Sequence, residues 1–189
     1  ATVGYLCGGF TSVRVTTSDG LTFSTDTSTM VTKGALTVAA NWCSGVNSST
    51  IGYTASMDTG AYVDTSNGLT FSTDTTAQVT KGVQVTAKSR GAGATNSSTI
   101  GYWAGGETGT AAQTENNGLT FSTDTTGMVT KGALVTLRKI VGAFNSSTIG
   151  YNSGGLTSAA DNASTTSTDA LTFSTDTTAM VTKGVLTGQ

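Results

Sequence analysis

The sequence predicts an all-β fold built from four tandem copies of a unit of about 49 residues. The first observation is that short strings recur in one order along the whole chain. Gly-Tyr begins at Gly4, Gly52, Gly101 and Gly150, Leu-Thr-Phe-Ser-Thr-Asp-Thr at Leu21, Leu69, Leu119 and Leu171, Val-Thr-Lys-Gly at Val31, Val79, Val129 and Val181, and Asn-Ser-Ser-Thr at Asn47, Asn96 and Asn145. The second observation is composition: 42 of the 189 residues are Thr, there is no Pro, and Thr, Val, Tyr and Phe favour strands.

Each copy is interpreted as four short strands, and the second copy shows the pattern. Residues 50–55 follow an Asn-Ser-Ser turn and form the first strand. Residues 69–73 form the second strand by alternation of apolar and polar side chains. Residues 74–77 then make a tight turn that begins with Asp, residues 78–81 return antiparallel, and residues 83–87 supply a variable fourth strand.

Four antiparallel strands in a unit of about 45–50 residues are typical of a β-propeller blade. A β-solenoid coil of about 20–30 residues fits the period less well. We therefore predict a single repeat domain over residues 1–189, with repeats at approximately 1–46, 47–95, 96–144 and 145–189. Its four repeats form a β-propeller that is either closed with four blades or part of a larger ring or array.

Gly-Gly pairs at Gly8, Gly105 and Gly154 follow the Gly-Tyr strand in three repeats. With these pairs, the chain resembles kelch-like β-propeller proteins, and more closely the kelch-type repeats of cyanobacterial and cyanophage fibre-like proteins. The resemblance covers the whole chain. The second repeat departs from it with Ala55-Ser56 in place of Gly-Gly, and kelch propellers normally have more than four blades.

The frame of the repeats predicts one strand too few. The chain holds four copies of three strands but three copies of the fourth. Residues 185–189, a second copy of the chain, or further repeats could supply the missing strand. An unpaired sheet edge invites such pairing, so we expect self-association into an oligomer or filament.

Composition excludes several function classes. Nine scattered Lys and Arg and a net charge of −2 argue against a nucleic-acid partner. No apolar run of about 18 residues occurs, so no membrane span is expected. The absence of His removes the usual general base and the commonest zinc ligand, so we expect no enzyme activity, no cofactor and no metal site. The first residue is not Met, which suggests a processed or partial chain; no signal peptide is visible, and secretion stays open.

The acidic and cysteine residues have simple interpretations. Asp26, Asp74, Asp124 and Asp176 are expected to form turns near the Lys seven residues on, namely Lys33, Lys81, Lys131 and Lys183, rather than a ring of catalytic or calcium-binding acids. Cys7 and Cys43 form either a disulfide or two buried free thiols. Glycosylation acceptor patterns occur at Asn47, Asn96, Asn145 and Asn162, although Asn-Ser-Ser is also simply a good turn.

The repeats differ in two regions. One is the stretch before each Asn-Ser-Ser turn, at residues 40–43, 88–90 and 138–140; the other is the loop after each Gly-Tyr, at residues 57–66, 103–116 and 152–168. Such variation permits a grafted binding site, with Trp42, Tyr62 and Trp103 as candidate sugar-stacking platforms, although loops also vary because they tolerate change.

Taken together, the sequence predicts a non-enzymatic extracellular structural protein: a fibre, filament or virion-surface component that self-associates. The alternative is a carbohydrate-binding or adhesion module with glycan sites between blades. A hydrolase that uses Asp58, Asp64, Glu107 and Glu115 has less support, because each of these acids occurs in a single repeat.

Overall fold

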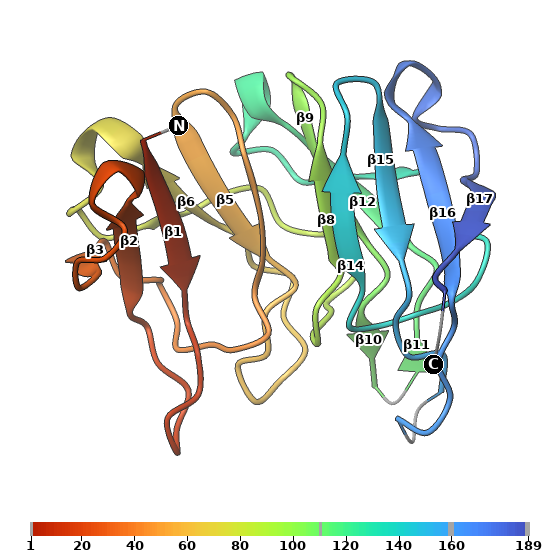
Figure 1. The fold of residues 1–189 in the computed structure, drawn as a ribbon, viewed down its shortest axis with the longest axis horizontal. Helices are drawn as coiled ribbons and strands as arrows, with labels where there is room; N and C mark the ends of the chain where they lie inside the picture. Colours follow the sequence, from red (N-terminus) through yellow and green to blue (C-terminus); the bar gives the residue numbers. More distant parts are fainter. Residues whose placement is uncertain (1, 110, 159–160, 188–189) are drawn as a thin grey trace.

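The computed structural model describes residues 2–109, 111–158 and 161–187. Its described part is all-β, as predicted, with several small antiparallel sheets and single-turn 3-10 helices. Figure 1 shows four sheets following one another along the long axis of the molecule, with the first at one end and the fourth at the other. No helix in these ranges is long and apolar enough to cross a membrane.

The strands of each sheet lie side by side in chain order. The first sheet contains β1 (Val3–Cys7), β2 (Ser18–Thr22) and β3 (Val31–Lys33). The second contains β4 (Ser44–Asn47), β5 (Ile51–Ala55), β6 (Asn67–Thr70) and β7 (Val79–Thr80). The third contains β8 (Gly93–Asn96), β9 (Ile100–Ala104), β12 (Asn116–Thr120) and β13 (Val129–Lys131), with a hairpin of β10 (Glu107–Thr108) and β11 (Ala111–Ala112) between β9 and β12. The fourth contains β14 (Gly142–Asn145), β15 (Ile149–Ser153), β16 (Ser167–Thr172) and β17 (Val181–Val185).

The predicted shortage of one strand is confirmed in the described residues, because the first sheet has three strands and the other three sheets have four. Strands β4, β8 and β14 each precede an Asn-Ser-Ser turn, and no such turn precedes β1. Each four-stranded sheet therefore takes its first strand from the end of the preceding sequence repeat.

The Asn-Ser-Ser turn closes a tight hairpin, as predicted. In the second sheet, the Ser48 hydroxyl oxygen accepts hydrogen bonds from the backbone N–H groups of Thr50 (3.3 Å) and Ile51 (3.0 Å). Asn47 then pairs with Gly52 across the hairpin. The same serine bonds recur at Ser97 and Ser146, so the turn sets the register of all three hairpins.

Two predicted strands are wrong in position. The strand predicted at 69–73 ends at Thr70, and Phe71–Thr73 form a 3-10 helix that turns the Phe71 ring onto Tyr5 of the preceding sheet. The strand predicted at 83–87 does not form, and β8 lies at Gly93–Asn96 instead. A tight hairpin pairs the residues nearest its turn, so residues 83–92 are left to cross from β7 to the opposite edge of the next sheet.

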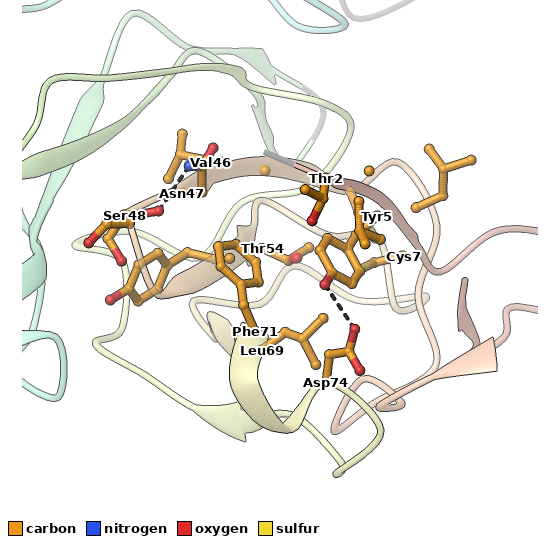
Figure 2. A pocket seen from close by; sticks show the side chains of 18 residues that line it. Thr2, Tyr5, Cys7, Val46, Asn47, Ser48, Thr54, Leu69, Phe71 and Asp74 are labelled. Atoms are coloured by element: carbon orange, nitrogen blue, oxygen red, sulfur yellow. Dashed lines mark hydrogen bonds between the residues drawn. The ribbon is translucent and has the colours of Figure 1, made fainter. Parts of the chain in front are cut away.

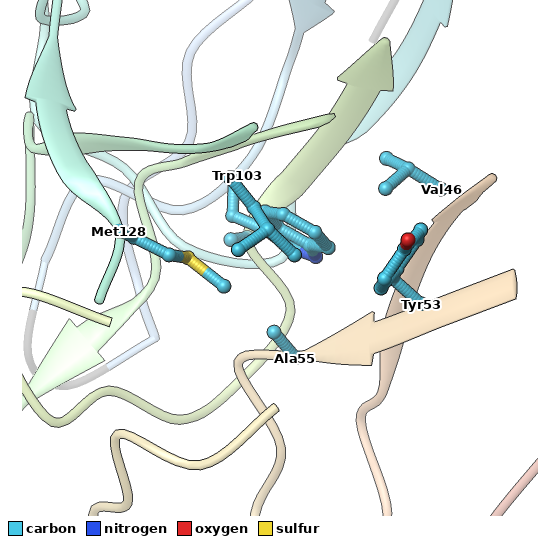
Figure 3. Close-up of a cluster of buried hydrophobic side chains, with 7 residues drawn as sticks. Val46, Tyr53, Ala55, Trp103 and Met128 are labelled. Atoms are coloured by element: carbon cyan, nitrogen blue, oxygen red, sulfur yellow. The ribbon is translucent and has the colours of Figure 1, made fainter. Parts of the chain in front are cut away.

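Neighbouring sheets pack on each other through small apolar clusters. Between the second and third sheets, Trp103 and Met128 meet Val46, Tyr53 and Ala55 (Figure 3). A related cluster around Tyr102, Leu134, Leu171 and Met180 joins the third sheet to the fourth. The core is therefore divided among the junctions between sheets.

The sheets contact one another in sequence. Strand β8 contacts β4 on one side and β14 on the other. Among the described residues, no hydrogen bond or ion pair joins the first sheet to the fourth. A closed four-bladed ring therefore stays a prediction.

Candidate functional site

The junction between sheets is the feature that the repeated strings build. The Gly-Tyr tyrosine of each of the first three sheets stacks on the phenylalanine of the next sheet. The ring pairs are Tyr5–Phe71, Tyr53–Phe121 and Tyr102–Phe173, with centroids 5.4, 5.1 and 5.3 Å apart and planes within 6° of parallel. Three junctions thus share one aromatic contact.

The same tyrosines bond to an aspartate of the next sheet. Tyr5, Tyr53 and Tyr102 donate their hydroxyl hydrogens to Oδ2 of Asp74, Asp124 and Asp176, each at 2.9 Å. Lys33, Lys81 and Lys131 place Nζ 2.9 Å from the same three oxygens. The prediction that each Asp lies near the Lys seven residues on is wrong: the Lys reaches the Asp of the next repeat, because that turn faces the preceding sheet.

A backbone hydrogen bond completes each junction. The N–H groups of Gly34, Gly82 and Gly132 donate to the carbonyl oxygens of Asp74, Asp124 and Asp176, each at 2.7 Å. A Cβ at these glycines would lie 1.8, 1.9 and 1.8 Å from the carbonyl oxygens of Thr76, Thr126 and Thr178. No side chain fits this approach, which explains the glycine of each Val-Thr-Lys-Gly string.

Electrostatics favour the protonated tyrosine and the charged aspartate at the first junction. Burial and the hydrogen bond to Asp74 raise the pKa of Tyr5 to about 12. Burial alone would raise the pKa of Asp74, but the bonds from Lys33 and Tyr5 outweigh it and the pKa falls below its usual value. Burial and the bonds to Asp124 and Asp176 likewise raise the pKa values of Tyr53 and Tyr102.

Successive side chains on a Gly-Tyr strand face opposite neighbours. Tyr53 faces the third sheet, whereas Trp103 faces back to the second sheet and donates its indole N–H to the Ser44 carbonyl oxygen at 3.1 Å. Gly101 leaves room for Val46 of the second sheet, whose Cγ2 would lie 2.5 Å from an added Cβ. On β9, Tyr102 stacks on Phe173 of the fourth sheet while Trp103 faces the second, so this strand has one row of contacts for each neighbour.

A groove marks the place where the first sheet has no fourth strand. It has a volume of about 860 Å³ and lies between β1 and the residues of β4, β5 and β6. Figure 2 shows Tyr5 and Cys7 on one side, with Val46 and Phe71 among the other lining residues. At the next two junctions, β4 and β8 occupy the equivalent position and place Val46 and Thr95 against the following sheet.

The variable stretch of one repeat lies next to the variable loop of the following repeat. Isolated bridges join Asn41 to Asp58, Ser89 to Glu107, and Lys139 to Leu156. The variable stretch before each Asn-Ser-Ser turn therefore runs beside the variable loop of the next sheet.

Buried charges in these regions were not predicted from the sequence. The side chains of Lys88, Arg138 and Lys139 are fully buried. Lys139 contacts Glu107 and lies 2.6 Å from Asp161, and these bonds raise the Lys139 pKa although burial acts to lower it. Burial lowers the pKa of Lys88, with Glu115 3.3 Å away as partial compensation. One sequence signal could have indicated these buried ion pairs. In two repeats, basic residues before the Asn-Ser-Ser turn occur together with acidic residues in the loop of the following sheet.

The acids considered for hydrolysis have ion-pair partners, apart from exposed Asp64. Asp58 pairs with Arg14 at 2.9 Å, Glu115 with Lys88, and Glu107 with Lys139. Within the described ranges, no group of three or more Cys, Asp or Glu side chains could hold a metal ion.

The candidate stacking aromatics divide into two kinds. Trp42 and Tyr62 are 47% and 40% exposed, and the Tyr62 hydroxyl donates to Glu107 at 3.1 Å. Trp103 is fully buried in the junction, so its ring offers no face to a sugar.

Two cysteines and four possible glycosylation sites complete the set of predicted site residues. Cys7 and Cys43 are both half-buried and pack against one cluster with Leu36, Ala40 and Met57. Burial and neighbouring Cys7 raise the pKa of the Cys43 thiol to about 12. The disulfide stays a prediction. Among the possible glycosylation sites, Asn47, Asn145 and Asn162 are exposed and Asn96 is half-buried.

Comparison with known proteins adds no family. No family model matches the chain, and no curated protein matches it. The kelch-like resemblance therefore rests on the repeat motifs alone.

Gly82→Ala should destabilise the chain by about 3 kcal/mol or more, because its Cβ would meet the Thr126 carbonyl oxygen at 1.9 Å. Gly127→Ala is the matched control: an added Cβ there has its nearest neighbours at 3.9 Å, and the second and fourth repeats have Ala77 and Ala179 at the same position. We expect a change within about 1 kcal/mol for the control. Denaturant unfolding measures both, and equal effects would contradict the close approach.

Stability should fall as pH rises from 10 to about 12. The folded-state pKa of Tyr5 lies above its ordinary value of 10.0, so its contribution is fully present below pH 10 and is lost as pH approaches 12. Asp74 affects stability in acid. Its folded-state pKa lies below the ordinary value of 3.8, so the stability that its charge contributes is present above pH 3.8 and is lost as the pH falls through the folded-state pKa. Denaturation midpoints and the ultraviolet absorbance of tyrosinate follow these changes. Tyrosines that all ionise near pH 10 in the folded protein would contradict the expected Tyr–Asp bonds.

Proposed function

We propose that this protein is a non-enzymatic extracellular structural protein, a fibre, filament or virion-surface component assembled from its β-sheet repeats. The observation that carries the proposal is the junction between sheets, which uses the same Tyr, Phe, Asp, Lys and Gly positions three times. The most strongly repeated residues thus serve to join one sheet to the next.

A propeller-like arrangement is part of this proposal. Each four-stranded sheet has its strands in chain order, as a propeller blade does, and β8 contacts the first strands of both neighbouring sheets. We take the four sheets as consecutive blades of a larger ring or open array, in line with the kelch-like repeat pattern.

A glycan-binding role is the second candidate, and one observation favours it. Trp42 and Tyr62 are both exposed, and they lie on segments joined by the bridges from Asn41 to Asp58 and from Asp58 to Tyr62. Exposed aromatic rings on adjoining variable segments suit stacking on sugar rings. Trp103 is buried and serves as the unresponsive tryptophan in a fluorescence assay.

Glycan binding should change the Trp42 fluorescence, and Trp42→Ala should abolish the change while Trp103 still fluoresces. Titration with a panel of soluble oligosaccharides measures this. A response that persists in the Trp42→Ala variant would place the binding elsewhere, and fluorescence that no sugar changes would remove the candidate.

The structural role predicts self-association. Light scattering over a wide concentration range should show particle mass rising with concentration, and electron microscopy should show elongated particles. A protein that stays a single copy at every concentration would contradict the filament.

A further inference from the structure

The first sheet leaves one half of the repeated junction unused. Asp26 and Phe23 are exposed, whereas their counterparts in the later sheets are half-buried against the preceding sheet. Phe23 is 53% exposed, and Leu6, at the position of buried Trp103, is 66% exposed. This surface, which we call the leading face, contains Leu6, Phe23 and Asp26.

The fourth sheet leaves the other half unused. Lys183 is exposed, and no ion pair to it is found in the described part of the chain, whereas Lys33, Lys81 and Lys131 are all paired. Tyr151 stacks on Phe144 of its own sheet, with centroids 5.1 Å apart, in place of a phenylalanine of a following sheet. Gly184 is open, with nothing within 4 Å of an added Cβ. Phe144, Tyr151, Lys183 and Gly184 define the trailing face.

We propose that copies of this chain join end to end, with the trailing face of one copy packed on the leading face of the next through the contacts of the internal junctions. The inference rests on the proposed structural function and names its partner as a second copy. The contacts assigned to it are Tyr151 on Phe23, the Tyr151 hydroxyl and Lys183 Nζ on the Asp26 carboxylate, and Gly184 against the Asp26 carbonyl.

The leading face already has the shape that a junction needs. Its Phe23–Thr25 turn ends at Asp26 with φ −67° and ψ −11°. The turns inside the three junctions end at Asp74, Asp124 and Asp176 with φ of −68°, −69° and −68° and ψ of −5°, −2° and −6°. The turn therefore forms without a neighbour, and docking needs little reorganisation there.

The apolar surfaces of the two faces also correspond. Phe144, 59% exposed, occupies the strand position at which Val46 meets Gly101 and Thr95 meets Gly150. Its counterpart on the leading face is Gly4, where an added Cβ would contact the Phe23 ring alone. In the proposed contact, the exposed Phe144 ring therefore faces Gly4, as Val46 faces Gly101 and Thr95 faces Gly150 at two internal junctions.

One local change accompanies docking. Strand β17 continues to Val185, whereas β13 ends at Lys131 because the next residue, Gly132, donates its N–H to Asp176 of the following sheet. Gly184 must turn from β17 toward Asp26 in the same way.

Two different faces that fit each other give a head-to-tail contact, which propagates into an open chain of copies unless the geometry closes it into a ring. The opposite charges of Asp26 and Lys183 favour this pairing over contact between two like faces.

Gly184→Ala is the sharpest test. The open space at Gly184 predicts an unchanged unfolding midpoint, while the 1.8–1.9 Å approach at the three internal glycines predicts that a Cβ blocks docking. By analytical ultracentrifugation, we expect assembly of this variant to require at least a roughly tenfold higher concentration than the wild type. Gly127→Ala, outside both faces, should assemble normally. Normal assembly of Gly184→Ala would overturn the inference.

Charge exchange supplies the second measurement. Asp26→Lys and Lys183→Asp should each suppress assembly alone and restore it when the two variants are mixed, because each then supplies the opposite charge to the other. Asp64→Lys makes the same charge change at an exposed position of the second sheet and should have no effect. If the wild type assembles and the Asp26→Lys and Lys183→Asp variants each assemble equally well alone, the end-to-end contact is overturned. The proposed structural function would still stand. A wild type that never assembles would contradict both.

Discussion

Each junction depends on one carboxylate in a tight turn. Oδ2 of Asp124 accepts a hydrogen bond from Tyr53 and forms an ion pair with Lys81 of the preceding sheet, and the Asp124 carbonyl oxygen accepts the Gly82 N–H. The stacked Phe121 is held by the 3-10 turn that ends at this Asp. Charge, aromatic packing and backbone pairing therefore share one anchor, and the close approach of the glycine lets all three form at once.

The variable regions distinguish junctions that the repeated residues make alike. Lys139 pairs with Glu107 and Asp161, and Arg138 pairs with Asp169, whereas Lys88, at the repeat position of Arg138, pairs with Glu115. Breaking such a buried pair leaves a charge without a partner, at a free-energy penalty of about 3–5 kcal/mol. A sheet packed on the wrong neighbour would incur this penalty, so the unrepeated charges fix the order in which the repeats pack.

Features that depend on residues within one repeat could be predicted from the sequence. Register of the recurring strings predicted the all-β class, the Asn-Ser-Ser hairpins and the missing strand of the first sheet. It failed where position depends on the neighbouring sheet: Phe71 leaves its strand to reach Tyr5, and Lys33 pairs with Asp74 rather than Asp26. The burial of Trp103 and Lys139 could not be predicted either, because no pattern within one repeat shows which residues the neighbouring repeat places against it.

Because of the groove beside β1, the two ends of the molecule are expected to differ in how readily they unfold. A stack whose members touch only their neighbours unfolds from its ends, since an end member loses one junction where an inner member loses two. The first sheet also lacks the strand that fills the equivalent space at later junctions. We therefore expect fraying to begin at the first sheet and hydrogen-exchange protection to rise from there toward the junction that contains Trp103.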